Sequence, residues 1–122
     1  MDSKILIIED EPALLELYIF LLKKAGFRVE GVGNGMLGLK KIIKNTYDLV
    51  LLDVMLPQKD GLELLASLRK RKIKKLPIII LLTNLDQESI FEKAAQLGVS
   101  DFLIKSDVLP DEFIVKVQKW LS

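Results

Sequence analysis

Short apolar runs alternate with longer stretches of helical periodicity along the whole chain, and this alternation limits the folds that are available. The runs are continuous in apolar character and mostly rich in β-branched residues, which indicates buried strands. Pro12 and Pro110 suit first helical positions, and Gly26 and Gly98 suit helix ends. The pattern predicts strands at residues 4–8, 27–32, 48–52, 77–82 and 99–104, and helices at residues 12–25, 35–45, 61–72, 86–97 and 110–121.

Five strand–helix units of this kind predict an α/β fold. Because the strands are apolar on both faces, we expect a doubly wound five-stranded parallel sheet with helices on both faces. The common flavodoxin-like order of such a sheet is 2-1-3-4-5, and its ligands bind at the carboxyl ends of the strands. A chain of 122 residues has the size of one ordinary domain, so we expect a single domain over residues 1–122.

The absence of Cys and His excludes several kinds of chemistry from this chain. Without Cys it has no disulfides and no thiolate metal sites, and without His it cannot alone build Ser-His catalysis, a His-ligated zinc site or a phosphohistidine relay. No apolar run approaches the ~20 residues of a membrane span, and the segment before Glu9 lacks the basic region of a signal peptide. We therefore expect a cytoplasmic protein without membrane association.

A basic cluster, RKRKIKK at residues 69–75, makes the charge distribution uneven. The net charge is only +1, so the other positions carry 12 basic against 17 acidic residues, a balance of −5. The cluster ends a helical pattern just before Pro77, where cations suit both the helix C-terminus and the solvent. We interpret it as a solvated helix end and expect no nucleic acid to bind this domain.

Polar residues stand at the carboxyl ends of the predicted strands. Glu9 and Asp10 follow the first strand, Asp53 follows the third, Thr83 follows the fourth and Lys105 follows the fifth. In the order 2-1-3-4-5 the first and third strands are neighbours, so the three acids should lie together. Thr83 and Lys105 should approach them from the next two strands.

A cluster of carboxylates either raises a pKa or takes a cation. Oxygen ligands without His or Cys favour a hard ion, and a small number of protein ligands suits Mg²⁺, which keeps several waters and often binds phosphate. Together with the Lys105 ammonium and the Thr83 hydroxyl, this set of groups suits phosphoryl transfer. Asp53 would be the nucleophile and would form an acyl phosphate.

Two other functions compete for the same residues. The segment GNGMLG at 33–38 matches the dinucleotide-binding pattern G-x-G-x-x-G, and Asp53 would then bind a ribose hydroxyl. The alternative explanation is that Asn34 and Gly35 form a strand-to-helix turn in which the glycine accepts positive φ. A flavin-binding relative is disfavoured by acids where a phosphate would have to lie. An aspartyl-nucleophile phosphatase would need a second acid where Met55 stands.

Four segments occur in order along the chain: LIIEDEP, DLVLLDVMLPQKDG, IIILLTN and DFLIKS. With these segments the chain resembles the response-regulator receiver domain of two-component phosphorelay signalling over nearly its whole length. The resemblance implies a signalling domain rather than an enzyme, which promotes its own phosphorylation and dephosphorylation. Its phosphodonor would be a histidine kinase or a histidine phosphotransfer protein.

The resemblance also implies roles for individual residues at the acidic site. Asp10 and Asp53 would bind Mg²⁺ directly, the Met55 carbonyl would supply a third protein ligand, and Glu9 would act through a water. Asp53 would be the phosphorylation site, and Lys105 would pair with the phosphoryl oxygens.

Thr83 and Phe102 would form the switch pair of such a domain, with Thr83 moving to the phosphoryl group and Phe102 rotating inward behind it. The change would reach residues 84–121 and present them to a downstream protein or to an output domain outside this chain. A phosphorylation-dependent homodimer through residues 86–121 is a further expectation. The family usually has a proline after the lysine in a cis peptide, whereas this chain has Ser106, so the geometry of the Lys105–Ser106 peptide is left open.

The segment at 12–26, PALLELYIFLLKKAG, is more apolar than a helix with one buried stripe requires. At 100° per residue, Phe20 falls in the middle of the polar face, 40° from Glu16. We therefore expect Phe20 to be exposed. With its neighbour Ile19, it would form part of a docking surface for the phosphodonor, resembling how receivers present this helix to the helical bundle of a kinase.

Overall fold

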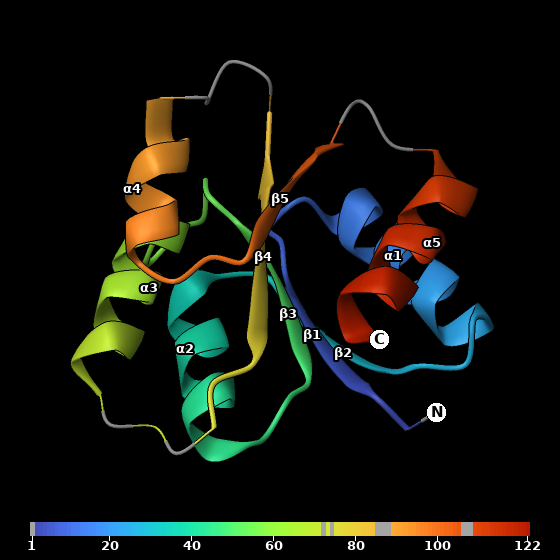
Figure 1. Ribbon diagram of the computed structural model, residues 1–122, viewed down its shortest axis with the longest axis horizontal. Coiled ribbons are helices and arrows are strands. Elements are labelled where there is room, and N and C mark those ends of the chain that lie inside the picture. The colour runs from blue at the N-terminus through green and yellow to red at the C-terminus, as the bar shows by residue number, and fades with distance from the viewer. Residues whose placement is uncertain (1, 72, 74, 85–88, 106–108) are drawn as a thin grey trace.

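The computed structural model describes residues 2–71, 73, 75–84, 89–105 and 109–122. Five strands form a parallel sheet with helices on both faces (Figure 1). The strands are Lys4–Ile8 (β1), Arg28–Val32 (β2), Leu49–Asp53 (β3), Ile78–Thr83 (β4) and Asp101–Ile104 (β5). The helices are Pro12–Lys24 (α1), Gly35–Lys44 (α2), Gly61–Lys70 (α3), Phe91–Gln96 (α4) and Pro110–Leu121 (α5).

The strand order is β2-β1-β3-β4-β5 and every pairing is parallel, which confirms the predicted doubly wound fold. The register aligns the carboxyl ends of the central strands. Ile8 of β1 lies opposite Leu52 of β3, and Asp53 lies opposite Leu82 of β4. The side chains that follow these strands therefore meet at one edge of the sheet.

Two apolar cores cover the two faces of the sheet. One core packs α2, α3 and α4 on one face, and the other packs α1 and α5 on the opposite face (Figure 1). Strand residues alternate between them: Leu6 and Ile8 belong to the first core, whereas Ile5 and Ile7 belong to the second. The continuous apolar character of the strands follows from this two-sided burial.

The helix ends follow the sequence signals. Pro12 and Pro110 occupy the first turns of α1 and α5, where a missing N–H has no cost. Gly26 and Gly98 stand just beyond the ends of α1 and α4 with φ of 98° and 100°, the left-handed region that favours glycine. These predictions of helix ends are confirmed.

Several predicted boundaries move by a few residues. Strands β3 and β4 each extend one residue further than expected, so Asp53 and Thr83 are the last residues of their strands. Helix α3 ends at Lys70 rather than at residue 72. Of the helix predicted at 86–97, the structure has Phe91–Gln96 as α4, and residues 85–88 lie outside the described part.

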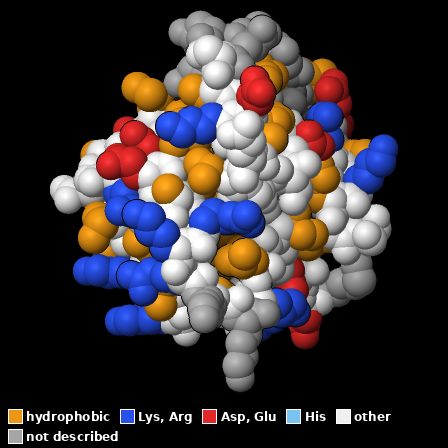
Figure 2. Space-filling view, turned by 60° about the vertical axis from the view of Figure 1, so that its left-hand side comes forward, with side chains coloured by type: hydrophobic (Ala, Val, Ile, Leu, Met, Phe, Trp, Pro, Cys, Tyr) orange, Lys and Arg blue, Asp and Glu red, His pale blue; other side chains and the backbone are white. Residues whose placement is uncertain are grey.

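The basic cluster lies at the end of α3. Arg69, Lys70, Arg71 and Lys75 are all exposed, as expected for a solvated helix end, and residues 72 and 74 lie outside the described residues. Figure 2 shows Lys and Arg side chains gathered on the left of the face that it presents. Within the described residues, no helix combines the length and the apolarity that a membrane crossing needs.

A partly buried hydrogen bond joins the loop before β3 to the edge strand β2. Tyr47 is 1% exposed and its hydroxyl donates to Glu30 Oε1 at 2.6 Å. This hydrogen bond is the main cause that lowers the pKa of Glu30 below 4.5, and Lys4 and Lys41 add to the effect. Burial is the main cause that raises the pKa of Tyr47, and the hydrogen bond to Glu30 adds to the rise.

We predict that Tyr47→Phe lowers the free energy of unfolding at pH 7 by about 1 kcal/mol, because the ring is retained and one hydrogen bond to a partly exposed carboxylate is lost. A carboxyl whose folded-state pKa is lowered contributes stability above its unfolded-state pKa and loses it as the pH falls through the folded-state value. Urea unfolding at several pH values should therefore show a deficit that is full above pH 4.5 and shrinks below it. A deficit that is the same at every pH would exclude Glu30 as the partner.

Candidate functional site

Three carboxylates meet at the carboxyl ends of β1 and β3. Glu9 and Asp10 directly follow β1, and Asp53 ends β3. One ligand atom from each of the three lies within 4.8 Å of the others. Glu9 is 0% exposed and Asp53 is 3% exposed, whereas Asp10 is exposed. The strand order thus brings together the acids that the sequence analysis singled out.

Lys105 bridges the two buried acids. Its Nζ lies 2.6 Å from Glu9 Oε1 and 2.9 Å from Asp53 Oδ2. Lys105 directly follows β5, so its side chain reaches past the end of β4 to the acids on β1 and β3. Two buried acids therefore share one ammonium group, and Asp10 lies beside them.

Few other groups donate to the acids. The backbone N–H of Met55 donates to Asp53 Oδ1 at 3.4 Å, and that of Glu11 donates to Glu9 Oε2 at 3.2 Å. Apart from its ion pair with Lys105, Glu9 Oε1 is buried and accepts no well-directed hydrogen bond within the described part of the chain. A buried carboxylate oxygen in this state has capacity for a further positive partner.

The electrostatics follow from burial and from the excess of negative charge. Burial raises the pKa of Glu9, and the neighbouring carboxylate of Asp53 adds to the rise while Lys105 opposes it. Burial alone would lower the pKa of Lys105, but its close contacts with the carboxylates of Glu9 and Asp53 more than offset it, so the pKa is raised. Lys105 is therefore a cation at neutral pH, and the site keeps a net negative charge that favours a metal ion.

An open hollow lies beside the cluster. It is lined by Asp10, Met55, Leu56, Pro57 and Asp60. Met55 is 64% exposed at its rim. Asp10 can therefore be reached from solvent on the side of the loop between β3 and α3.

The two residues expected to form a switch lie on neighbouring strands. Thr83 ends β4, is 0% exposed, and donates a hydrogen bond from its hydroxyl to the Asn84 carbonyl at 3.2 Å. Phe102 of β5 is half-buried and stacks on Phe91 of α4, with ring centroids 4.4 Å apart and planes at 27°. The sequence analysis missed Phe91, because a contact between residues so far apart in the chain leaves no periodic signal. The Lys105–Ser106 peptide lies outside the described residues.

The glycine pattern at 33–38 has a packing explanation. Gly35 does not have positive φ, so the expected reason for that glycine was wrong. Instead, a Cβ at Gly35 would overlap the carbonyl oxygen of Lys59, and the Gly35 N–H donates to the Pro57 carbonyl at 3.3 Å. The start of α2 thus packs on the loop that carries Met55, in the space where a dinucleotide pyrophosphate would have to lie.

The two residues of α1 that were expected at a docking surface differ in their exposure. Phe20 is 61% exposed, and Lys24 Nζ lies 5.9 Å from the centre of its ring. Ile19 is only half-buried, yet it packs against the core, and its side chain lies against Gly31 of β2. Leu17, one turn before Phe20, is 44% exposed. The exposed apolar surface here comprises Phe20 and Leu17 more than Ile19.

Comparison with known proteins identifies the class that this fold and site define. The chain belongs to the response regulator receiver domain family, whose sequence model matches residues 5–118. Receiver domains are the signalling domains of two-component response regulators, so the predicted family is confirmed.

Two curated relatives and one solved structure illustrate the similarity. The chain is 36% identical over 105 residues to the alkaline phosphatase synthesis transcriptional regulatory protein PhoP of Bacillus subtilis, covering 86% of this chain and 43% of that protein. It is 38% identical over 105 residues to the response regulator ArlR of Staphylococcus saprophyticus, covering 84% and 46%. The chain thus spans less than half the length of these relatives.

The solved structure is the receiver domain of the sensor histidine kinase PA1611 from Pseudomonas aeruginosa, described with a magnesium ion coordinated in its active site cleft. It matches with a TM-score of 0.86 and 27% identity over 99% of this chain and 98% of that one.

We predict that Gly35→Ala lowers the free energy of unfolding by about 1–3 kcal/mol, because the new methyl group displaces the backbone at Lys59. Gly33→Ala in the same pattern is the matched control, since a Cβ there meets nothing within 4 Å. Chemical denaturation of both variants measures the difference. Equal stabilities for the two variants would contradict the packing explanation.

Proposed function

We propose that Asp53 accepts a phosphoryl group from a phosphohistidine of a partner protein, in a reaction that needs Mg²⁺. The observation that carries this proposal is the Lys105 ammonium held between Glu9 and Asp53, with Asp10 beside them. A buried carboxylate beside a lysine and further acids is equipped to be a nucleophile and to stabilise added phosphoryl oxygens.

The donor set fits a divalent cation. Asp10 and Asp53 would hold Mg²⁺ with the Met55 carbonyl, and Glu9 would act through a water. Supporting this, the ligand atoms are all oxygens, the acids lie within 4.8 Å of one another, and Glu9 Oε1 accepts no well-directed hydrogen bond from the described residues. When bound, the ion neutralises part of the carboxylate charge and polarises the phosphoryl group.

The chemistry on this chain is one displacement at phosphorus. An Asp53 carboxylate oxygen attacks the phosphorus, the P–N bond to the donor imidazole breaks, and the imidazole leaves with the electron pair and takes up a proton. Lys105 stays protonated and pairs with the phosphoryl oxygens as Asp53 changes from a carboxylate to an acyl phosphate. In dephosphorylation, water attacks the phosphorus and the Asp53 carboxylate leaves.

The switch would begin at Thr83 and pass to Phe102. The Thr83 hydroxyl would leave the Asn84 carbonyl and bind a phosphoryl oxygen, and Phe102 would move inward into the space that Thr83 vacates. Because Phe102 stacks on Phe91, this movement would change the position of α4. The surface over residues 84–121 would then differ between the two states.

The wider role follows from the family. Residues 1–122 would act as one receiver domain, phosphorylated by a histidine kinase or a histidine phosphotransfer protein in the cytoplasm. The output would be a downstream protein or a domain outside this sequence, and phosphorylation-dependent dimerisation through residues 86–121 is a further proposal. The proposed role includes no binding of nucleic acid by this domain.

The phosphodonor would dock on α1, which begins beside the acidic site. Phe20 is exposed there and Leu17 lies one turn away, while Ile19 contributes only its exposed part. An exposed aromatic residue suits the centre of an interface.

We predict that Asp53→Asn abolishes phosphate uptake from a small-molecule phosphodonor with Mg²⁺, because the amide cannot act as the nucleophile. Asp60→Asn is the matched control: it removes a carboxylate from the neighbouring loop but keeps an N-cap oxygen for the Glu63 N–H. Intact-mass spectrometry over time measures both variants. Uptake by the Asp53 variant at the normal rate would refute the proposed function.

We predict that Phe20→Ala leaves phosphorylation by a small-molecule donor unchanged and weakens binding of the protein donor by about 1–2 kcal/mol. Leu37→Ala on α2 is the control, since Leu37 is 47% exposed and lies away from α1. Transfer rates at several concentrations of phosphorylated donor provide the measurement. The docking surface is wrong if Phe20→Ala and Leu37→Ala behave alike.

A further inference from the structure

The outward face of α2 combines lysines with large apolar side chains. At about 100° per residue, five of its residues occupy one arc of about 120°. All five are exposed, whereas the opposite side of the helix packs into the core; they are Met36, Leu37, Lys40, Ile43 and Lys44. The apolar three are exposed by 39%, 47% and 41%. The fold therefore leaves a mixed basic and apolar helix face uncovered.

Further cations lie at the same end of the sheet. Lys70, Arg71 and Lys75 are exposed at the end of α3 and beyond it. The Ile78 N–H donates to the Asp48 carbonyl at 3.1 Å, so the loop after α3 lies beside the loop after α2. Figure 2 shows hydrophobic side chains between the Lys and Arg side chains on its left. We call this surface the basic face, and it comprises Lys40, Lys44, Lys70, Arg71 and Lys75 with Met36, Leu37 and Ile43.

The described part of the chain does not neutralise the basic face. None of its five cations forms an ion pair within the described residues. Residues 35–44 and 69–75 contain no acid. Asp48 lies in the loop after α2, but it is half-buried and accepts the Lys4 N–H at 2.8 Å. The basic face thus carries a positive charge that an anionic partner can offset.

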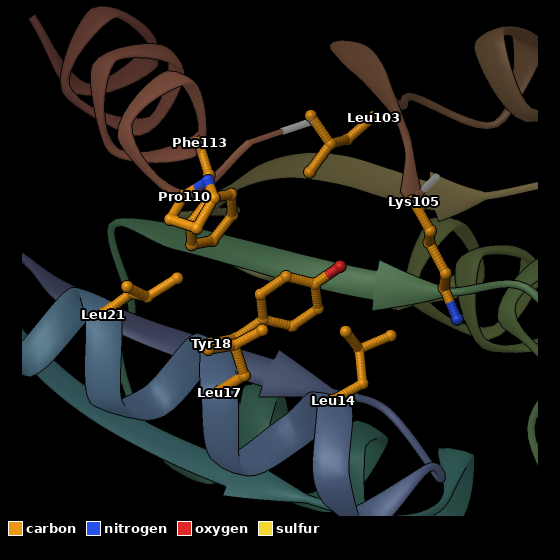
Figure 3. Close-up of a pocket in the computed structure, with 8 residues that line it drawn as sticks. All are labelled: Leu14, Leu17, Tyr18, Leu21, Leu103, Lys105, Pro110 and Phe113. Atoms are coloured by element: carbon orange, nitrogen blue, oxygen red, sulfur yellow. The ribbon is translucent and has the colours of Figure 1, made fainter. Parts of the chain in front are cut away.

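The opposite face of the sheet has a more balanced charge. The pocket of about 100 Å³ between α1 and α5 has mostly apolar walls, and the one cation in its described lining, Lys105, is paired with acids (Figure 3). On α5, the exposed Lys116 and Lys119 are accompanied by Asp111 and Glu112. The basic face is therefore a local feature and not a result of the overall charge, which is only +1.

We propose that the basic face binds the surface of a lipid bilayer that carries anionic headgroups. Lysine and arginine attract such headgroups, and apolar side chains between them enter the boundary between headgroups and acyl chains. The sequence analysis expected no membrane association because no apolar run could span a bilayer. A reversible contact at the surface needs no such run.

The composition of the basic face favours lipid over other anionic partners. Lysine is depleted in protein–protein interfaces, whereas here Lys40 lies one turn from both Met36 and Ile43. Interfaces with nucleic acid are highly polar, and exposed apolar side chains would add nothing to contacts with phosphates. A bilayer surface makes use of both kinds of side chain.

The charge distribution also sets an orientation on the bilayer. Glu9, Asp10 and Asp53 lie at the carboxyl ends of the strands, whereas α2 and α3 end at the opposite edge of the sheet (Figure 1). With a net charge of only +1, the protein as a whole is hardly attracted to an anionic surface, and its acidic end is repelled. The basic face would therefore meet the bilayer with the acidic site toward the solvent.

Co-sedimentation of the chain with lipid vesicles tests the proposal. The chain should bind vesicles of phosphatidylglycerol and phosphatidylcholine in equal parts but not phosphatidylcholine alone, and potassium chloride should weaken the binding by screening. Each cation near an anionic surface contributes roughly fivefold to the affinity, so Lys40→Gln with Lys44→Gln should weaken binding about twentyfold. Lys116→Gln with Lys119→Gln on α5 removes the same charge from the other face and should leave binding unchanged.

A second pair of variants tests the apolar part of the basic face. Ile43→Gln should weaken vesicle binding roughly threefold, because its side chain no longer enters the apolar boundary. Val115→Gln on α5 is the control, since Val115 is even more exposed than Ile43, at 61% against 41%, and lies on the other face. Surface changes of this kind leave the fold intact, which far-ultraviolet circular dichroism verifies.

The proposal is overturned if the chain does not sediment with the anionic vesicles. It is also overturned if the two double variants lose binding equally, since overall charge would then explain the binding. Tighter binding to duplex DNA than to the vesicles, with the same dependence on Lys40 and Lys44, would overturn it in favour of a nucleic-acid partner. The vesicle result holds whether or not Asp53 accepts a phosphoryl group, because neither lysine belongs to the acidic site.

Discussion

The ammonium group of Lys105 between two buried carboxylates is the interaction on which the site depends. Glu9 is 0% exposed and Asp53 is 3% exposed, and burying charged groups this deeply is costly unless they are paired, as both are here with Lys105. Lys105 reaches both only because the sheet order places β5 two strands from β3. One ammonium does not balance three acids, so the folded protein keeps a local excess of negative charge that a divalent cation can offset.

The two faces of the sheet contribute different features around the acidic site. On one face, the start of α2 packs on the loop between β3 and α3 through Gly35 and Lys59, and this packing positions the loop that carries Met55. On the other face, α1 and α5 enclose the pocket that contains Tyr18 and the Lys105 side chain. Lys105 connects the acidic cluster to the second face, because its Nζ contacts Asp53 while its side chain lines the pocket.

Much of the fold and of the acid cluster could be predicted from the sequence, because both follow from short-range patterns. Continuous apolar strands give a parallel sheet, and polar residues at strand ends give the positions of Glu9, Asp53 and Lys105. Features that depend on contacts between distant segments were not predictable. A glycine is needed at position 35 because the Lys59 carbonyl lies so close to it. The partial burial of Ile19 depends on its contact with Gly31 of β2. The helix wheel gave the exposure of Phe20 correctly, since that depends on α1 alone.

Equilibrium unfolding as a function of Mg²⁺ concentration shows whether the acids form a site for Mg²⁺ in the folded state. Since the unfolded chain does not hold Glu9, Asp10 and Asp53 together, Mg²⁺ should bind the folded form and stabilise it. At a concentration one hundred times the dissociation constant, the free energy of unfolding should rise by about 2.7 kcal/mol. Potassium chloride at the same ionic strength should not reproduce this. An unfolding free energy that responds equally to the two salts would contradict the account.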